Sequence, residues 1–173
     1  LIFSISEGQS TGVSRINFIG NRVFDDSTLR GQIATSESAW YKILSSSDNY
    51  DPDRLTFDAE RLRIFYTNRG YADFRLVSST ASLTPDRKSF FITFTIEEGQ
   101  QYRIGKVAVQ SDIKELTPAA LLPAVNIDSG EIYDRSKVGA AMDALTSAAG
   151  EKGYAFAQVD PRLLPNPRTR TID

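Results

Sequence analysis

The chain has 173 residues, of which 40% are hydrophobic, and a formal net charge of −2 from 20 basic and 22 acidic side chains. This hydrophobic fraction is typical of a globular protein, and the balanced charge gives no basic surface of the kind that nucleic-acid binding requires. The chain contains neither cysteine nor histidine. Disulfides are therefore excluded, and the commonest metal ligand and general base are missing.

No run of apolar residues approaches the length of a membrane helix, which needs about 20 residues. No signal-peptide pattern opens the sequence, because Leu1 stands within a strand-like segment. We therefore expect any targeting segment to lie outside this sequence.

The sequence repeats itself. The segment FSISEGQ at Phe3–Gln9 returns as FTIEEGQ at Phe94–Gln100, and Tyr50–Leu76 returns as Tyr133–Val159 with YD near its start and GYA near its end. Self-similarity of this kind indicates one supersecondary unit used in series. We expect the last strand of a preceding unit at residues 1–8, a complete unit at 10–99, and a further unit at 101–173 whose last strand is truncated.

Four helix starts in the two repeats share one chemistry, a polar N-cap residue between two apolar residues that can pack on each other. An apolar face at helical spacing follows the second start in each repeat, and a glycine suited to the left-handed C′ position ends it. The expected caps are Asp25, Asp51, Thr117 and Asp134, and the expected terminal glycines are Gly70 and Gly153.

Alternating apolar residues predict the strands, with a proline-containing turn at Thr84–Arg87 and another at Pro165–Arg168. The expected inward-facing strand residues are Ile16, Phe18, Ala72, Phe74, Leu76, Phe90, Ile92, Phe94 and Ile96 in the first repeat, and Val107, Val109, Ala155, Ala157 and Val159 in the second. We therefore expect an α+β fold class, with tandem β-α-α-β-β units that each contain a three-stranded mixed sheet and two helices on one face. Leu29, Leu55, Leu62 and Phe65 should complete the first core.

No set of side chains stands at a catalytic spacing, so we expect no enzyme activity, cofactor or metal site. The pairs Glu7-Gly8 and Glu98-Gly99 recur at a strand end before each new unit, which indicates an inter-domain junction. Gly20-Asn21 indicates a turn, because it lacks the lysine and glycine context of a phosphate loop. Trp40, in a polar loop, either fills the core or contacts a neighbour.

The order of these motifs resembles the POTRA domain family. The residues that carry the resemblance are Gly20-Asn21-Arg22-Val23-Phe24, Tyr50-Asp51, Gly70-Tyr71-Ala72 and Glu98-Gly99. The first complete unit is most similar to the third domain of a POTRA array and the next to the fourth. The second repeat departs from the pattern at Ser111-Asp112, where Gly-Asn is expected.

The resemblance implies a periplasmic scaffold of the outer-membrane β-barrel assembly machinery, in a Gram-negative bacterium. Its implied partners are unfolded outer-membrane β-barrel proteins and accessory lipoproteins, with attachment to the outer membrane through a carboxy-terminal barrel outside this sequence. Two alternatives stay open: the POTRA array of a related outer-membrane transporter, for two-partner secretion or autotransporter assembly, and a structural spacer without client binding.

A three-stranded sheet has two edges, and an extended client segment can add to an edge by β-augmentation. The strand after Gly70 should lie at an edge, whereas the more apolar strand at Ser89–Glu97 should be central. Asp73, Arg75 and Val77 should face outward, and Asp73 and Arg75 could instead protect the edge from aggregation. The expected client-pairing residues are Tyr71, Ala72, Asp73, Phe74, Arg75, Leu76, Val77, Ser78 and Ser79.

Overall fold

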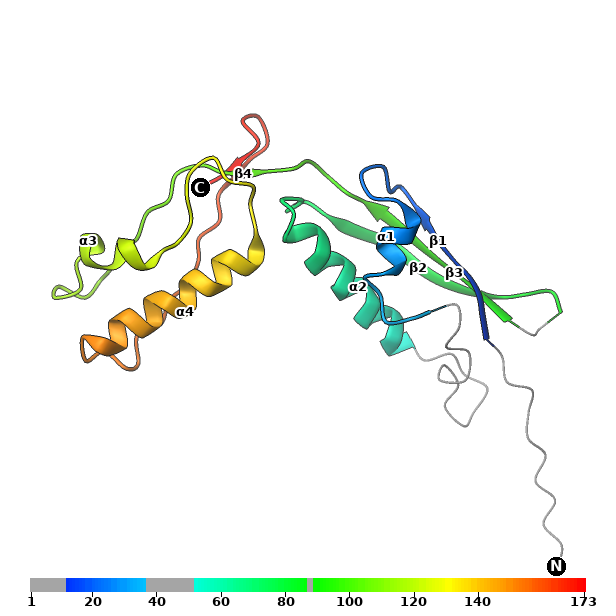
Figure 1. Ribbon diagram of the computed structural model, residues 1–173, viewed down its shortest axis with the longest axis horizontal. Helices are drawn as coiled ribbons and strands as arrows, with labels where there is room; N and C mark the ends of the chain where they lie inside the picture. The colour runs from blue at the N-terminus through cyan, green and yellow to red at the C-terminus, as the bar shows by residue number, and fades with distance from the viewer. Residues whose placement is uncertain (1–11, 37–51, 87–88) are drawn as a thin grey trace, which may run out of the picture. The chain divides into compact units, whose positions relative to one another are not determined.

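The structure is a computed structural model that describes residues 12–36, 52–86 and 89–173 (Figure 1). The chain divides into two compact units. Unit 1 contains the described residues of Leu1–Phe65 and Phe74–Glu98, and unit 2 contains Tyr66–Asp73 and Gly99–Asp173. The end of one helix and the turn after it therefore belong to unit 2.

Unit 1 contains a three-stranded mixed sheet in the order β1-β3-β2. Its strands are β1 (Gly12–Ile19), β2 (Arg75–Leu83) and β3 (Ser89–Glu97). β1 runs parallel to β3, and β2 runs antiparallel to it. The central strand is the most apolar of the three, as expected for a strand with a neighbour on each side.

The helices of unit 1, α1 (Asp26–Arg30) and α2 (Pro52–Thr67), lie on one side of this sheet (Figure 1). The buried residues of β1 and β3 lie on one face: Ile16 pairs with Ile92, and Phe18 with Phe94. The core also contains Val13, Leu29, Ile33, Leu55, Leu62, Phe65, Phe74 and Ile96, whereas Leu76 is half-buried. The predicted fold class is confirmed.

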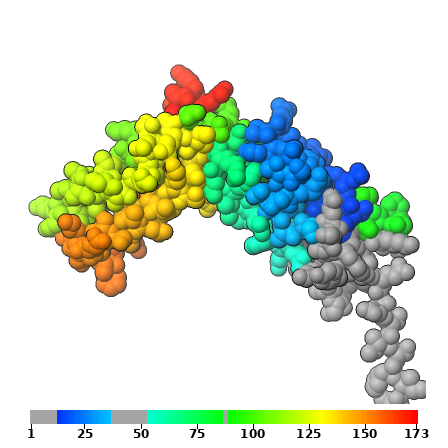
Figure 2. Space-filling model, in the orientation of Figure 1, coloured from blue at the N-terminus to red at the C-terminus, as the bar shows by residue number. Residues whose placement is uncertain are grey.

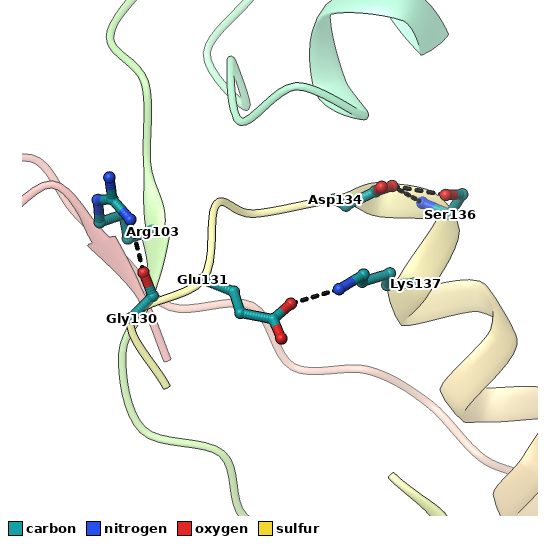
Figure 3. A network of polar contacts seen from close by, with 6 residues as sticks. All are labelled: Arg103, Gly130, Glu131, Asp134, Ser136 and Lys137. Carbon is teal, nitrogen blue, oxygen red and sulfur yellow. Dashed lines mark hydrogen bonds and ion pairs between the residues drawn. The ribbon is translucent and has the colours of Figure 1, made fainter. Parts of the chain in front are cut away.

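The helix starts have the predicted polar caps in two places. Asp25 Oδ1 accepts a hydrogen bond from the Thr28 N–H at 2.8 Å, which lowers the pKa of that carboxyl. Asp134 Oδ1 accepts from the Ser136 N–H at 2.8 Å (Figure 3). Thr117 stands at the N-cap with Pro118 next to it, but its side chain makes no capping bond, so that part of the prediction is wrong. Asp51 and its neighbour Tyr50 lie outside the described residues, as does Trp40.

The glycines at the ends of the two long helices have the predicted left-handed conformation. Gly70 and Gly153 both have a φ of 92°. The Tyr71 N–H donates to the Tyr66 carbonyl at 3.1 Å, and the Tyr154 N–H donates to the Ala149 carbonyl at 3.0 Å. Both helices therefore end in the Schellman motif, in which a residue beyond the glycine satisfies a carbonyl of the last turn.

Unit 2 contains α3 (Pro118–Leu121), the short 3-10 helix η2 (Leu122–Ala124) and α4 (Arg135–Glu151). Its strands, β4 (Arg103–Ile104), β5 (Pro165–Asn166) and β6 (Thr171–Ile172), form a sheet in the order β4-β6-β5. β6 is parallel to β4 and antiparallel to β5, which is the pattern of unit 1. The turn that joins β5 to β6 lies at the surface (red in Figure 2).

The strands of unit 2 are shorter than predicted. Residues 105–110, which include Val107 and Val109, are not in a strand, and neither are residues 155–164 with Ala155, Ala157 and Val159. A strand requires the backbone groups of a neighbour, and the central strand β6 offers only two residues within this sequence. Val107 and Val109 still pack against buried clusters of unit 2.

The segment before α4 is fixed to β4 by polar contacts (Figure 3). The Ile104 N–H donates to the Glu131 carbonyl at 2.7 Å, and Arg103 Nη1 donates to the Gly130 carbonyl at 2.7 Å. Glu131 also forms an ion pair with Lys137 on α4, which raises the pKa of the lysine. These contacts place the Asp134 cap at the start of α4.

Candidate functional site

The strand β2 lies at one edge of the unit 1 sheet, with β3 as its neighbour. It contains nine residues, RLVSSTASL, from Arg75 to Leu83. No other strand among the described residues pairs with its second side. An edge strand of this length presents a row of backbone N–H and C=O groups to which another chain can bind.

The first four expected client-pairing residues, Tyr71–Phe74, are not in the strand, so the predicted strand boundary is wrong. The Schellman turn after α2 uses the Tyr71 N–H, and the Tyr71 ring packs edge-to-face on Tyr66. Ala72 packs against the buried cluster around Tyr102 in unit 2, and Phe74 is buried. The edge therefore begins at Arg75 and extends four residues beyond Ser79, to Leu83.

One hydrogen bond fixes which backbone groups of β2 point outward. The Thr84 N–H donates to the Ser89 carbonyl at 2.7 Å, so Thr84 points toward β3. In an antiparallel ladder, residues point alternately toward and away from the neighbouring strand. Ser82, Thr80 and Ser78 therefore bond to β3, and the N–H and C=O groups of Leu83, Ala81 and Ser79 point away from it.

A β-bulge between Leu76 and Ser78 changes the alternation of side chains along β2. Before the bulge, Leu76 faces the helix-covered side, as predicted. Beyond the bulge, Ser79 pairs with the buried Phe94 and Ala81 with the buried Ile92, so these two small residues face the helices. Ser78, Thr80 and Ser82 are exposed on the other side of the sheet.

Charged side chains stand only at the beginning of β2. Arg75 is exposed and forms an ion pair with Glu97 on β3. Asp73, the other residue predicted to protect the edge from aggregation, precedes the strand and accepts a hydrogen bond from the Tyr102 hydroxyl at 2.6 Å. From Leu76 to Leu83 the strand has neither charge nor proline. Charges, prolines and bulges are features by which natural edge strands avoid pairing with another chain, and none of them stands beyond the bulge, from Ser78 to Leu83, which favours a pairing function there.

Of the junction residues, Glu98 and Gly99 are described, and Glu7 and Gly8 lie outside the described residues. The Glu98 side chain is buried and accepts hydrogen bonds from the backbone N–H groups of Arg22 and Val23 at 2.9 and 3.1 Å. Gly99 has a φ of 74°, and a Cβ there would lie 2.8 Å from the Asp73 Cβ. The Glu-Gly motif thus joins the end of β3 to the Gly-Asn turn after β1.

Two residues that the sequence analysis missed also bind backbone groups. Asp58 on α2 is fully buried, and its carboxylate accepts from the N–H groups of Ala34 and Thr35 at 2.6 and 3.2 Å. An acidic residue on the apolar face of a predicted helix was the available signal. In unit 2, the Tyr102 N–H donates to the Gly70 carbonyl at 2.8 Å, and the bond from its hydroxyl to Asp73 raises the pKa of Tyr102.

Within the described ranges, no group of three histidine, cysteine, aspartate or glutamate side chains is arranged to hold a metal ion. The same part of the chain has no helix that is both long and apolar enough to cross a membrane. Among the described residues, the outer side of β2 offers backbone groups to which another chain could bind.

The architecture is that of a tandem array of small α+β units, each with a three-stranded sheet backed by helices. The POTRA family model, described as "Surface antigen variable number repeat", matches residues 11–99 and 102–173. The chain belongs to the POTRA family.

Curated relatives point to one kind of POTRA protein. Over 170 residues the chain is 31% identical to the outer membrane protein assembly factor BamA of Neisseria meningitidis, covering 98% of this chain and 21% of the relative. It is 27% identical over 167 residues to BamA of Neorickettsia risticii, covering 96% of this chain and 22% of the relative. The chain therefore spans about a fifth of the length of these relatives.

Solved structures agree on the fold. The BamA POTRA3-5 structure from Haemophilus influenzae matches with a TM-score of 0.77 and 20% identity, over 94% of this chain and 63% of that one. BamA from Haemophilus ducreyi lacking POTRA domains 1-3 matches with a TM-score of 0.65 and 15% identity, over 94% of this chain and 28% of that one. The assignment of the two units as third and fourth stays a prediction.

Proposed function

We propose that this chain is part of a periplasmic scaffold for outer-membrane protein assembly, and that it receives unfolded outer-membrane β-barrel proteins by β-augmentation on β2. The names of the BamA relatives support the assembly role. The scaffold is the periplasmic portion of an outer-membrane protein. This chain contributes the last strand of a preceding unit at 1–8, a complete unit at 10–99, and a further unit at 101–173 whose last strand is truncated, with Glu98-Gly99 as the junction between the last two.

The observation that carries the proposal is the free, uncharged edge from Leu76 to Leu83. Main-chain hydrogen bonds to such an edge give affinity with little dependence on the client's side chains. A receiver of many different barrel proteins needs this property. The client then adds to the edge strand Arg75–Leu83, and the residues that pair with it are Ser79, Ala81 and Leu83, whose main-chain groups point outward.

The docking of accessory lipoproteins is also part of the proposal, and it rests on the resemblance to the POTRA family. A spacer without client binding is the alternative that the edge argues against. A long edge without protecting charges would be a liability to a protein that binds nothing there.

Proline at position 81 tests the proposal. The Ala81 N–H points away from β3, so Ala81→Pro removes a donor from the free edge without removing a bond of the sheet. We expect the 173-residue chain to keep its fold and to bind a peptide from an unfolded barrel protein at least about tenfold more weakly, because a main-chain bond is lost and the ring obstructs pairing.

Ala81→Ser is the matched control, because it retains the backbone N–H and keeps the side chain as small as that of Ser79 on the same face. Circular dichroism should show the same secondary structure in both variants. In the full-length protein, photo-crosslinkers at Ser79 and Leu83 should trap nascent barrel proteins, and one at Glu60 on the exposed side of α2 should not. Crosslinks from Glu60 alone would replace strand addition with a helix-surface mode.

A further inference from the structure

The two sides of the β2 edge offer different environments to an added strand. On the helix-covered side, Ser79 and Ala81 are half-buried next to the buried residues Phe94 and Ile92 of β3. On the open side, the exposed hydroxyl residues Thr80 and Ser82 pair with Thr93 and Phe91. An added strand would therefore have one side toward the core and one side toward water.

The hydrogen-bond phase of β2 is the choice of which residues point their N–H and C=O groups outward. This phase links the difference between the two sides to particular residues of the client. In antiparallel pairing, the client residues opposite Ser79 and Ala81 exchange both main-chain bonds with them, and directly opposite side chains share a face. The client residues that make the main-chain bonds are thus the ones whose side chains lie on the helix-covered side. The small side chains of Ser79 and Ala81 leave room there for larger apolar groups.

We propose that the β2 edge selects client strands by phase. The preferred client is an antiparallel strand with alternating apolar and polar residues, in which the apolar residues make the main-chain bonds to Ser79, Ala81 and Leu83. Strands of outer-membrane barrels have this two-residue alternation. The inference rests on the proposed function, because it specifies the class of segment that the same edge accepts.

The expected size of the selection follows from cross-strand pairs. Each well-matched pair contributes modestly relative to an alanine pair, so three apolar contacts on the helix-covered side give a preference of about tenfold for the correct phase. A one-residue slip moves every client side chain to the opposite face. An alternating peptide can therefore choose the better phase freely, and a test must remove that freedom.

Selective N-methylation of the peptide removes its freedom to slip by one residue into the other phase. We would measure, by calorimetry with the 173-residue chain, three versions of an alternating Leu/Thr peptide of about nine residues, the length of β2. One is unmethylated, one is N-methylated at two leucines, and one at two threonines. A methylated amide can neither donate nor approach β2, so it must point away from the edge.

Phase selection predicts that the threonine-methylated peptide binds like the unmethylated one, and that the leucine-methylated peptide binds about tenfold more weakly. Without selection, either methylated peptide would slip by one residue and bind equally well. Equal affinity would thus overturn the phase inference and leave strand addition intact. A weaker threonine-methylated peptide would overturn the antiparallel assignment, and binding of none of the three would overturn the proposed function itself.

A matched pair of protein variants gives a second readout. Ala81→Glu and Thr80→Glu each add one negative charge to β2, on the helix-covered side and on the open side respectively. We expect Ala81→Glu to weaken binding of the unmethylated peptide about tenfold and Thr80→Glu to change it less than about twofold. Equal effects of the two variants would contradict the proposed difference between the faces. If Ala81→Glu does not fold, the peptide comparison on the unmodified chain decides.

Discussion

Leu62→Ala should destabilise unit 1 by about 2–5 kcal/mol. Leu62 lies on the inner face of α2 and is fully buried. Removal of its side chain leaves a cavity that the surrounding core, which includes Leu55 and Phe65, cannot fill without rearrangement. A loss of this size is a large share of the free energy of unfolding of a typical domain, which is about 5–15 kcal/mol.

Chemical denaturation of the 173-residue chain would measure this effect as a lower midpoint of the unit 1 transition. Arg63→Ala is the control, because Arg63 is exposed and its guanidinium forms a surface ion pair with Glu60, and the loss of a surface pair should change stability by less than about 1 kcal/mol. A similar midpoint for both variants would show that α2 does not pack on the sheet as described.

Gly20→Ala should destabilise unit 1 by at least about 3 kcal/mol. Gly20 has a φ of 95°, which costs energy for any residue with a Cβ. A Cβ at this position would also lie 2.1 Å from the carbonyl oxygen of Ile96 on β3. The end of β1 and the end of β3 would have to separate, and the bonds from Arg22 and Val23 to Glu98 would weaken with them.

A glycine-to-alanine substitution elsewhere in the chain should increase stability. Gly139 lies within α4, and a Cβ there would meet nothing within 4 Å. Gly139→Ala should therefore stabilise unit 2 by up to about 1 kcal/mol, because alanine has the higher helix propensity. Thermal unfolding would compare the two variants. A tolerated Gly20→Ala would mean that the contact between β1 and β3 is looser than described.

The sequence predicted the features of the fold that depend on neighbouring residues. The caps Asp25 and Asp134 and the terminal glycines Gly70 and Gly153 are recognisable because each acts within about one helical turn. The alternation on β3 was likewise visible, because a central strand with one covered face repeats every two residues.

The features that depend on distant partners could not be predicted in this way. Glu98 binds the turn at Arg22, 76 residues earlier in the chain, and Asp58 binds Ala34 across 24 residues. The family motifs Gly-Asn and Glu-Gly were both noticed, but only the structure shows that Gly20 and Glu98 act on the same contact. The bulge at Val77 similarly changes which residues of β2 face outward.

The late start of β2 and the missing strand around Ala155 in unit 2 have a common cause. The alternation of Ala72, Phe74 and Leu76 predicted one strand, but the Schellman turn and the bond to Tyr102 hold Tyr71–Asp73 in unit 2. In unit 2, the alternating residues Ala155 and Ala157 lack the neighbouring strand that would order them. Side-chain alternation shows that a segment can be a strand, and the availability of a partner decides whether it is one.

Amide hydrogen exchange along β2, followed by NMR, tests strand addition most directly. In the free chain, the amides of Ser79, Ala81 and Leu83 should exchange rapidly, whereas those of Ser78, Thr80 and Ser82 should be protected by bonds to β3. A saturating client peptide should slow exchange at Ser79, Ala81 and Leu83 by more than about tenfold. If the peptide binds and these three amides still exchange rapidly, the client does not pair with the edge, and the account is wrong.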